Sequence, residues 1–221
     1  MNTSLIERIH QTSYWRINFK PIRFKQDLIE SLAKCSEIIQ DSIVSLRGWD
    51  YPHINRDGTV NGQDWVESEC DWSTHIEYWR FYQSGQFIHH MALQEDYAYE
   101  GENILSIIST LYQVTEIFEF VARLTAKGIY SEGMDLSISL HNTENRTLKI
   151  TDPLRSPLFA DHTCRQPQIV YQESFSQDEL LGKSRALALF ATEHVFERFN
   201  WNNPPINIMA EDQLKLLERR L

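Results

Sequence analysis

The sequence lacks the features of a secreted or membrane protein. Its three cysteines, Cys35, Cys70 and Cys164, are far apart and odd in number, so we expect no disulfide framework, and a reducing cytosol fits better. No stretch approaches the roughly 18 apolar residues of a membrane span. No charged-then-apolar leader opens the chain. These absences predict a cytoplasmic protein with no membrane contact.

Positive charge is also scarce. The chain has 21 Lys and Arg residues against 31 Asp and Glu residues, which gives a formal net charge of −10. Broad binding to a phosphate backbone relies on Lys and Arg to displace counterions. We therefore expect nucleic acid to bind only through a local patch or through a partner.

The usual catalytic signatures are missing as well. The chain contains no GxSxG, GxxxxGK[ST], GxGxxG or HExxH motif. Cys35 falls in the apolar stripe of a predicted helix, which favours an inert core thiol. The residues name no reaction. We expect no catalytic residue, no cofactor and no resident metal, and we favour a protein that is not an enzyme.

The clearest pattern that is present is a hairpin followed by a helix. Residues 75–93 read HIEYWRFYQSGQFIHHMAL, two aromatic and β-branched runs around residues 83–86, where Gly85 accepts the positive φ of a tight turn. Both faces of the first run carry aromatics, so it predicts a central strand covered on both sides. Residues 103–127 repeat apolar residues at helical spacing, and Gly128 ends them. We predict that this helix packs on the hairpin.

The remaining segments predict a mixed fold. Ser176 and Glu179 form a capping box at the start of a long helix, and residues 134–150 form a second hairpin with its turn at 142–145. Further helices are predicted for residues 1–11, 24–46, 176–200 and 210–221, and further strands for residues 13–20, 52–55 and 168–175. The pattern predicts an α+β fold, a largely antiparallel sheet with three long helices. We expect a single domain over residues 1–203, then a linker and a short helix over 204–221.

A run of versatile side chains follows the predicted 24–46 helix. Trp49 and Tyr51 can stack on a ring, and Arg47 can hold a phosphate or a carboxylate. Aromatics and Arg dominate interface anchors, so we predict that Arg47, Trp49, Tyr51, Trp65 and Trp72 bind a protein partner. One alternative is a structured connection in which Trp49 fills the core. Another is a small-ligand or nucleotide sensor whose pocket is this loop.

The competing hypothesis is a metal-dependent nuclease or hydrolase that uses His75, Glu77 and His90. A hairpin centred on residues 84–85 brings its two ends together, so one histidine of the His89-His90 pair can face His75. Adjacent strand residues point to opposite faces, so His89 and His90 cannot readily chelate one ion together. The more ordinary interpretation is a hydrogen-bonded core or surface histidine.

Acidic residues cluster just before the hairpin. Clustered carboxylates can bind a divalent ion or a basic partner surface, but this cluster lacks the Gly-containing spacing of a calcium loop. We expect an irregular, solvated loop after a turn at residues 56–59. Its acids are Asp64, Glu67, Glu69 and Asp71, flanked by Trp65 and Trp72.

Three stretches together carry a resemblance. They are LRGWDYPHI at residues 46–54, EYWRFYQSGQFIHHMAL at residues 77–93 and ELLGKSRALALFATEHVFERFNW at residues 179–201. They resemble the region that follows an AlbA/Schlafen-like nucleic-acid-binding domain in some uncharacterised prokaryotic proteins. The resemblance implies no activity and no functional residue. It implies a binding, assembly or sensor subunit of a prokaryotic multi-protein complex, with antiviral defence as its setting.

Overall fold

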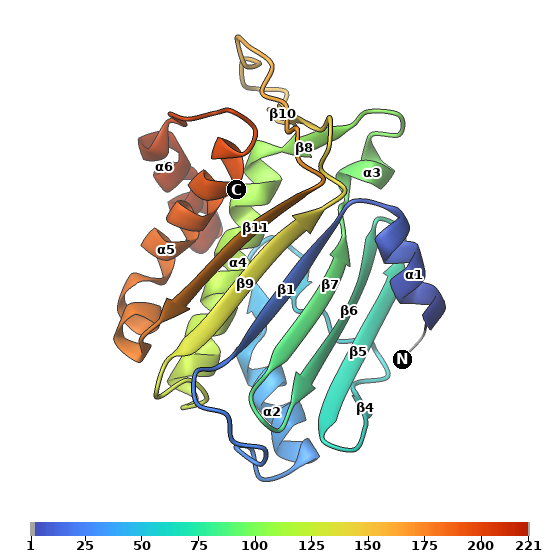
Figure 1. The fold of residues 1–221 in the computed structure, drawn as a ribbon, viewed down its shortest axis with the longest axis vertical. Coiled ribbons are helices and arrows are strands. Elements are labelled where there is room, and N and C mark those ends of the chain that lie inside the picture. The colour runs from blue at the N-terminus through green and yellow to red at the C-terminus, as the bar shows by residue number, and fades with distance from the viewer. Residues whose placement is uncertain (1–2, 221) are drawn as a thin grey trace.

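A seven-stranded sheet forms the centre of the molecule (Figure 1). The computed structural model describes residues 3–220. The strand order is β11-β9-β1-β7-β6-β5-β4, and all neighbouring strands run antiparallel. The predicted α+β class with a largely antiparallel sheet is therefore confirmed. The strands are β1 Tyr14–Pro21, β4 Val60–Asn61, β5 Trp65–Trp72, β6 His75–Tyr82, β7 Phe87–Ala92, β9 Met134–His141 and β11 Gln168–Phe175.

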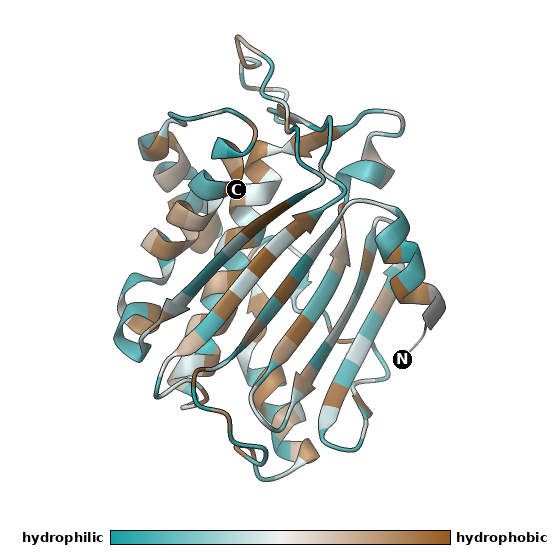
Figure 2. Cartoon of the chain, viewed as in Figure 1, coloured by the Kyte–Doolittle hydropathy of each residue, from teal (hydrophilic) through white to brown (hydrophobic). Residues whose placement is uncertain are grey.

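Helices cover the two faces of this sheet unequally. α2 (Leu32–Ser42), α4 (Ile107–Ala126) and α5 (Gln177–Glu197) lie behind the sheet in Figure 1, and α6 (Ile206–Leu217) packs on α4 and α5. α1 (Thr3–Gln11) lies on the front face against β6 and β7. Apolar and polar residues alternate along the strands (Figure 2). The main core fills the space behind the sheet, and its fully buried aromatics include Phe19, Trp79, Phe81, Phe87, Phe118 and Phe120.

The central hairpin forms as the sequence predicts. Gly85 has φ +80°, and its N–H donates to the Tyr82 carbonyl at 2.9 Å, which closes the turn between β6 and β7. Trp79 packs into the main core, whereas Ile76 and Tyr78 pack with α1 on the other face. β6 is thus covered on both sides. α4 packs behind it and begins at Ile107, because the hydroxyl of Ser106 caps it.

The predicted helix over residues 24–46 is wrong at both ends. α2 begins at Leu32, because the Ser31 hydroxyl accepts a hydrogen bond from the Lys34 N–H at 3.2 Å. Phe24, the first residue of the predicted helix, is 76% exposed in the preceding loop. α2 ends at Ser42. The chain then forms a small hairpin, β2 (Val44–Ser45) paired with β3 (Asp50–Tyr51), and no strand spans the predicted residues 52–55.

The acidic segment is a strand of the sheet, which corrects the predicted irregular loop. β5 pairs with β6 along its whole length, from Trp65 opposite Tyr82 to Trp72 opposite His75. Its acids have partners on the strand face. The Glu67 carboxylate accepts hydrogen bonds from Tyr78 Oη at 2.5 Å and from Arg80 at 2.7 Å. Such cross-strand partners stabilise a strand whose own sequence is rich in acidic residues.

The second predicted hairpin, over residues 134–150, is also wrong. β9 pairs with β1 and β11, while β10 (Thr147–Lys149) leaves the main sheet and pairs in parallel with β8 (Ile104–Ser106). The side chain of Arg146 explains the departure, because it is buried and donates to the Ile104 carbonyl and to Asp96. A buried guanidinium needs such partners.

The helices match the sequence in part. α4 has 20 residues and α5 has 21, but α2 has only 11, so three long helices are not formed. The predicted capping box is present, with the Ser176 N–H donating to the Glu179 carboxylate at 3.0 Å. Met1 and Asn2 of the predicted 1–11 helix, and Leu221 of the predicted 210–221 helix, lie outside the described residues. The division into a single domain and a tail stays a prediction.

Candidate functional site

A cavity of about 270 Å³ lies between the rear face of the sheet and the first turns of α4. β6 begins and β7 ends at this edge of the sheet, and the β2–β3 hairpin closes the remaining side. The cavity combines aromatic rings with an unusual number of buried polar groups. Its lining includes Trp15, Arg47, Trp49, His75, Glu77, Glu95, Thr110, Gln113 and Glu116.

Glu77 lies at the floor of the cavity and is 2% exposed. Its Oε2 lies 2.7 Å from His89 Nε2, and its Oε1 accepts a hydrogen bond from the indole N–H of Trp49 at 3.1 Å. Burial alone would raise the pKa of Glu77, but His89 and Trp49 stabilise the carboxylate and hold the pKa below its usual value. His89 Nδ1 in turn lies 3.3 Å from the Tyr51 hydroxyl.

A second carboxylate, Glu116, faces the cavity from α4. Arg47 reaches it from the β2–β3 hairpin, with Nε 3.0 Å from Oε1 and Nη2 2.9 Å from Oε2. The same guanidinium donates to Gln113 Oε1 at 3.0 Å. Burial raises the pKa of Glu116 even though Arg47 opposes the shift. This fork ties the hairpin to the helix across the cavity.

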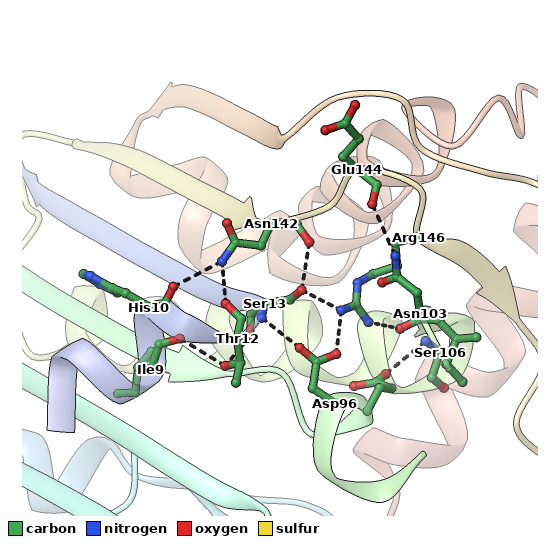
Figure 3. Close-up of polar contacts among 12 residues, drawn as sticks. Ile9, His10, Thr12, Ser13, Asp96, Asn103, Ser106, Asn142, Glu144 and Arg146 are labelled. Atoms are coloured by element: carbon green, nitrogen blue, oxygen red, sulfur yellow. Dashed lines mark hydrogen bonds and ion pairs between the residues drawn. The ribbon is translucent and has the colours of Figure 1, made fainter. Parts of the chain in front are cut away.

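The third carboxylate, Glu95, comes from α3 (Glu95–Ala98), a short helix that the sequence did not predict. Its Oε1 accepts the Ser106 N–H at 3.0 Å, and burial raises its pKa. Figure 3 shows the network that fixes α3: Asp96 accepts from Arg146 at 2.5 Å and from the Ser13 N–H at 2.8 Å. These contacts with Arg146 and Ser13 fix the position of α3, and with it the position of Glu95.

Aromatic rings close the mouth of the cavity. Trp49 stacks with His53 and with His75, whose ring centroids are 4.4 Å and 3.8 Å away. Trp72 stacks beside Trp49 at 5.7 Å and is 64% exposed. Burial lowers the pKa of His75, which favours its neutral form. His75 therefore adds aromatic surface at the mouth of the cavity without adding positive charge at neutral pH.

Two cavity groups have no hydrogen-bond partner among the residues that the structure describes. They are the Thr110 hydroxyl and the Gln113 side-chain nitrogen, both buried on α4. A buried polar group without a partner costs about 1–3 kcal/mol. Buried groups that face a cavity in this state are suited to a polar ligand.

The five predicted partner-binding residues do not form one surface. Arg47 and Trp49 line the cavity together with Tyr51, which is only 3% exposed. Trp72 stacks at the mouth. Trp65 lies on the opposite face of the sheet, because seven positions separate it from Trp72 on β5, and its ring covers the Arg80 guanidinium at 3.8 Å. Four of the five are thus brought together.

The predicted metal trio is also divided by the sheet. His75 and Glu77 face the cavity, whereas His90 faces the front groove between α1 and the sheet. Its neighbour His89 is the residue that meets Glu77. Within residues 3–220, no three His, Cys, Asp or Glu side chains converge with the geometry of an ion site. The alternation of strand side chains explains the separation.

Sequence reasoning missed Glu95, Thr110, Gln113 and Glu116. The only signal for Gln113 and Glu116 is their position beside Val114 and Ile117 in an otherwise apolar helix. Glu95 carries no local signal, since its place depends on the distant residue Arg146. These residues become a site only through tertiary packing.

No family model, curated protein or solved structure matches this chain. The resemblance to the region after AlbA/Schlafen-like domains therefore stays a prediction. In the described part of the chain, no helix has the length and apolar character needed to cross a membrane.

Proposed function

We propose that this chain is a ligand-sensing subunit whose cavity binds a small polar molecule carrying a positively charged nitrogen group. The observation that carries the proposal is the lining: three buried carboxylates share it with a single guanidinium, and two of its polar groups have no partner among the described residues. Concave sites with a few convergent polar groups are the usual form of a small-molecule site. The cavity fits the sensor alternative better than a flat partner surface.

The pairing of the charges indicates where the ligand nitrogen binds. Arg47 is paired with Glu116, and His89 is paired with Glu77. Glu95 accepts backbone N–H groups, including that of Ser106, and forms no ion pair with any residue of the described range 3–220. An ammonium or guanidinium beside Glu95 would stabilise its ionised form, while ligand acceptor atoms would take the Gln113 N–H.

Isothermal titration with a panel of small primary amines, guanidines, amino acids and carboxylates tests this proposal. We expect members with a cationic nitrogen to bind and carboxylates without one to be excluded. Glu95→Gln keeps the shape but removes the charge, and should weaken binding by about tenfold or more. Glu102→Gln, an exposed acid paired with Lys149, is the matched control. Equal binding by Glu95→Gln, or a preference for anions, would contradict the proposal.

A second function, assembly with a protein partner, is supported by the loop between β10 and β11. This loop projects beyond the sheet at the top of Figure 1. Leu154 is 93% exposed and Phe159 is fully exposed, whereas Arg155 anchors the base of the loop by two bonds to Asp212 at 2.5 and 2.7 Å. Large apolar side chains held out on an anchored loop favour insertion into an apolar partner pocket. Membership of a prokaryotic defence complex stays a prediction.

A further inference from the structure

A second concave site lies on the front face of the sheet, away from the cavity. It is a groove of about 370 Å³ between α1 and strands β1, β7 and β6. Its polar lining is made of arginines, histidines and tyrosines, and no Asp or Glu is among the described residues that line it. In a chain with a formal net charge of −10, such a surface is an exception.

Arg16 is the centre of this groove. It projects from β1, opposite His90 on β7 and Ser139 on β9, and is exposed. Its guanidinium makes no hydrogen bond or ion pair with any residue in the described range 3–220. The other arginine, Arg80, is already bound by Glu67 at 2.7 Å. The groove therefore presents one unneutralised guanidinium.

Three histidines line the groove together with Arg16. His10 Nε2 lies 3.1 Å from His90 Nδ1, and Tyr14 stacks between His10 and His141 with centroids 4.5 Å and 4.4 Å away. Burial, together with the charge of Arg16, lowers the pKa of His10 and of His141. Neutral imidazoles can donate an N–H to an anion, and they gain a proton readily when negative charge arrives.

We propose that this groove binds the phosphoryl group of a small organic phosphate, with Arg16 as its principal ligand. A guanidinium matches two phosphate oxygens with parallel N–H groups. The imidazoles of His10, His90 and His141 supply further donors around it. No carboxylate in the lining repels the anion. The site is independent of the rear cavity, because the sheet separates them.

Titration calorimetry with four probes tests the groove and separates the sources of the phosphate. The probes are inorganic phosphate, ribose 5-phosphate, adenosine monophosphate and a short single-stranded oligonucleotide. We expect a phosphomonoester to bind and Arg16→Gln to weaken it by about tenfold or more. Arg165→Gln removes the same charge from an exposed position on the β10–β11 loop and should leave affinity unchanged. Arg16→Lys should restore only part of the binding, because it loses the bidentate fork.

Imidazole NMR provides a readout that does not depend on affinity alone. Phosphate should shift the ring signals of His10, His90 and His141, and raise their pKa, while leaving those of the cavity histidine His75 unchanged. The oligonucleotide arm distinguishes a small ligand from a nucleic acid, since only the latter would bind it much more tightly than the monophosphate. That outcome would overturn the small-ligand assignment. Equal affinity of Arg16→Gln and wild type, or unshifted groove histidines, would overturn the site itself.

Discussion

The role that the sequence predicts for Trp49 differs from the role that its contacts in the fold indicate. Its sequence context is an aromatic, turn-rich run typical of an interface anchor. In the fold its indole N–H donates to Glu77, and the rings of His53 and His75 stack on its ring. Trp49 therefore closes the cavity, and Trp72 is the ring that remains exposed.

This difference predicts effects of different size for two tryptophan substitutions. Trp49→Ala removes a packed ring and leaves Glu77 without one of its donors, so it should cost about 2–4 kcal/mol of unfolding free energy. Trp72→Ala removes a ring that is 64% exposed, and should cost less than about 1 kcal/mol. Urea denaturation of both variants measures this. Similar losses for the two would show that the aromatic stack stabilises the fold as one unit.

The residues of the cavity show the limit of residue-level prediction. Arg47, Trp49 and Tyr51 could be found because versatile side chains are dense there in the sequence. Glu95 and Glu116 could not, because a single acid in a helix has no pattern of its own. Their role depends on contacts with Ser106 and Arg47, which only the packed fold brings close.

At the scale of elements, the β6–β7 hairpin supplies both candidate sites. Successive side chains on a strand point to opposite faces. Glu77 and His89 therefore meet on the rear face of the sheet, while Tyr78 and His90 line the front groove. The same alternation that divides the predicted metal trio gives the protein two chemically different surfaces, one acidic and one basic.

Prediction of the elements succeeded where the sequence signal is local. The turn at Gly85 and the capping box at Ser176 are encoded within a few residues, and both form as expected. The start of α2, the strand β5 and the pairing of β10 depend on distant partners. β5 pairs with β6 along its whole length, and Arg80 and Tyr78 of β6 bind its Glu67; no short window of sequence contains that information.

The β10–β11 loop makes a prediction at this scale. If it inserts into a protein partner, replacing Leu154 and Phe159 by Ser should abolish a specific association while the melting temperature stays unchanged, because both side chains are exposed. The tagged chain is purified from its native host, and the partner is identified and then titrated. Phe24→Ser, which changes another largely exposed aromatic on a different loop, should retain the complex. Retention by the double variant would remove this loop from the assembly hypothesis.

At the scale of the whole molecule, the histidines of the front groove connect stability to pH. Folding lowers the pKa of His90 to about 3, first by burial and then through the charges of His10, His89 and Arg16. Burial also lowers the pKa of His10 and His141. The unfolded chain therefore binds more protons than the folded chain below the ordinary value of 6.5. Their stabilisation is complete above that value and is lost as the pH falls towards the folded pKa.

His90→Gln isolates this effect from the rest of the molecule. The buried acids shift in different directions, with the pKa of Glu95 and Glu116 raised and that of Glu77 lowered, but they act equally in both proteins and cancel in the comparison. Between pH 7 and pH 5, wild type should lose about 1–2 kcal/mol more unfolding free energy than His90→Gln. Urea denaturation across this range, in buffers free of phosphate, measures the difference. Parallel curves would show that His90 gains its proton without cost and that the groove around it is open to water. Wild type and Arg16→Gln can also be compared by the effect of added phosphate on how steeply the free energy of unfolding depends on pH. If phosphate reduces this dependence in wild type but not in Arg16→Gln, the imidazoles that destabilise the fold at low pH are the same three that bind the anion.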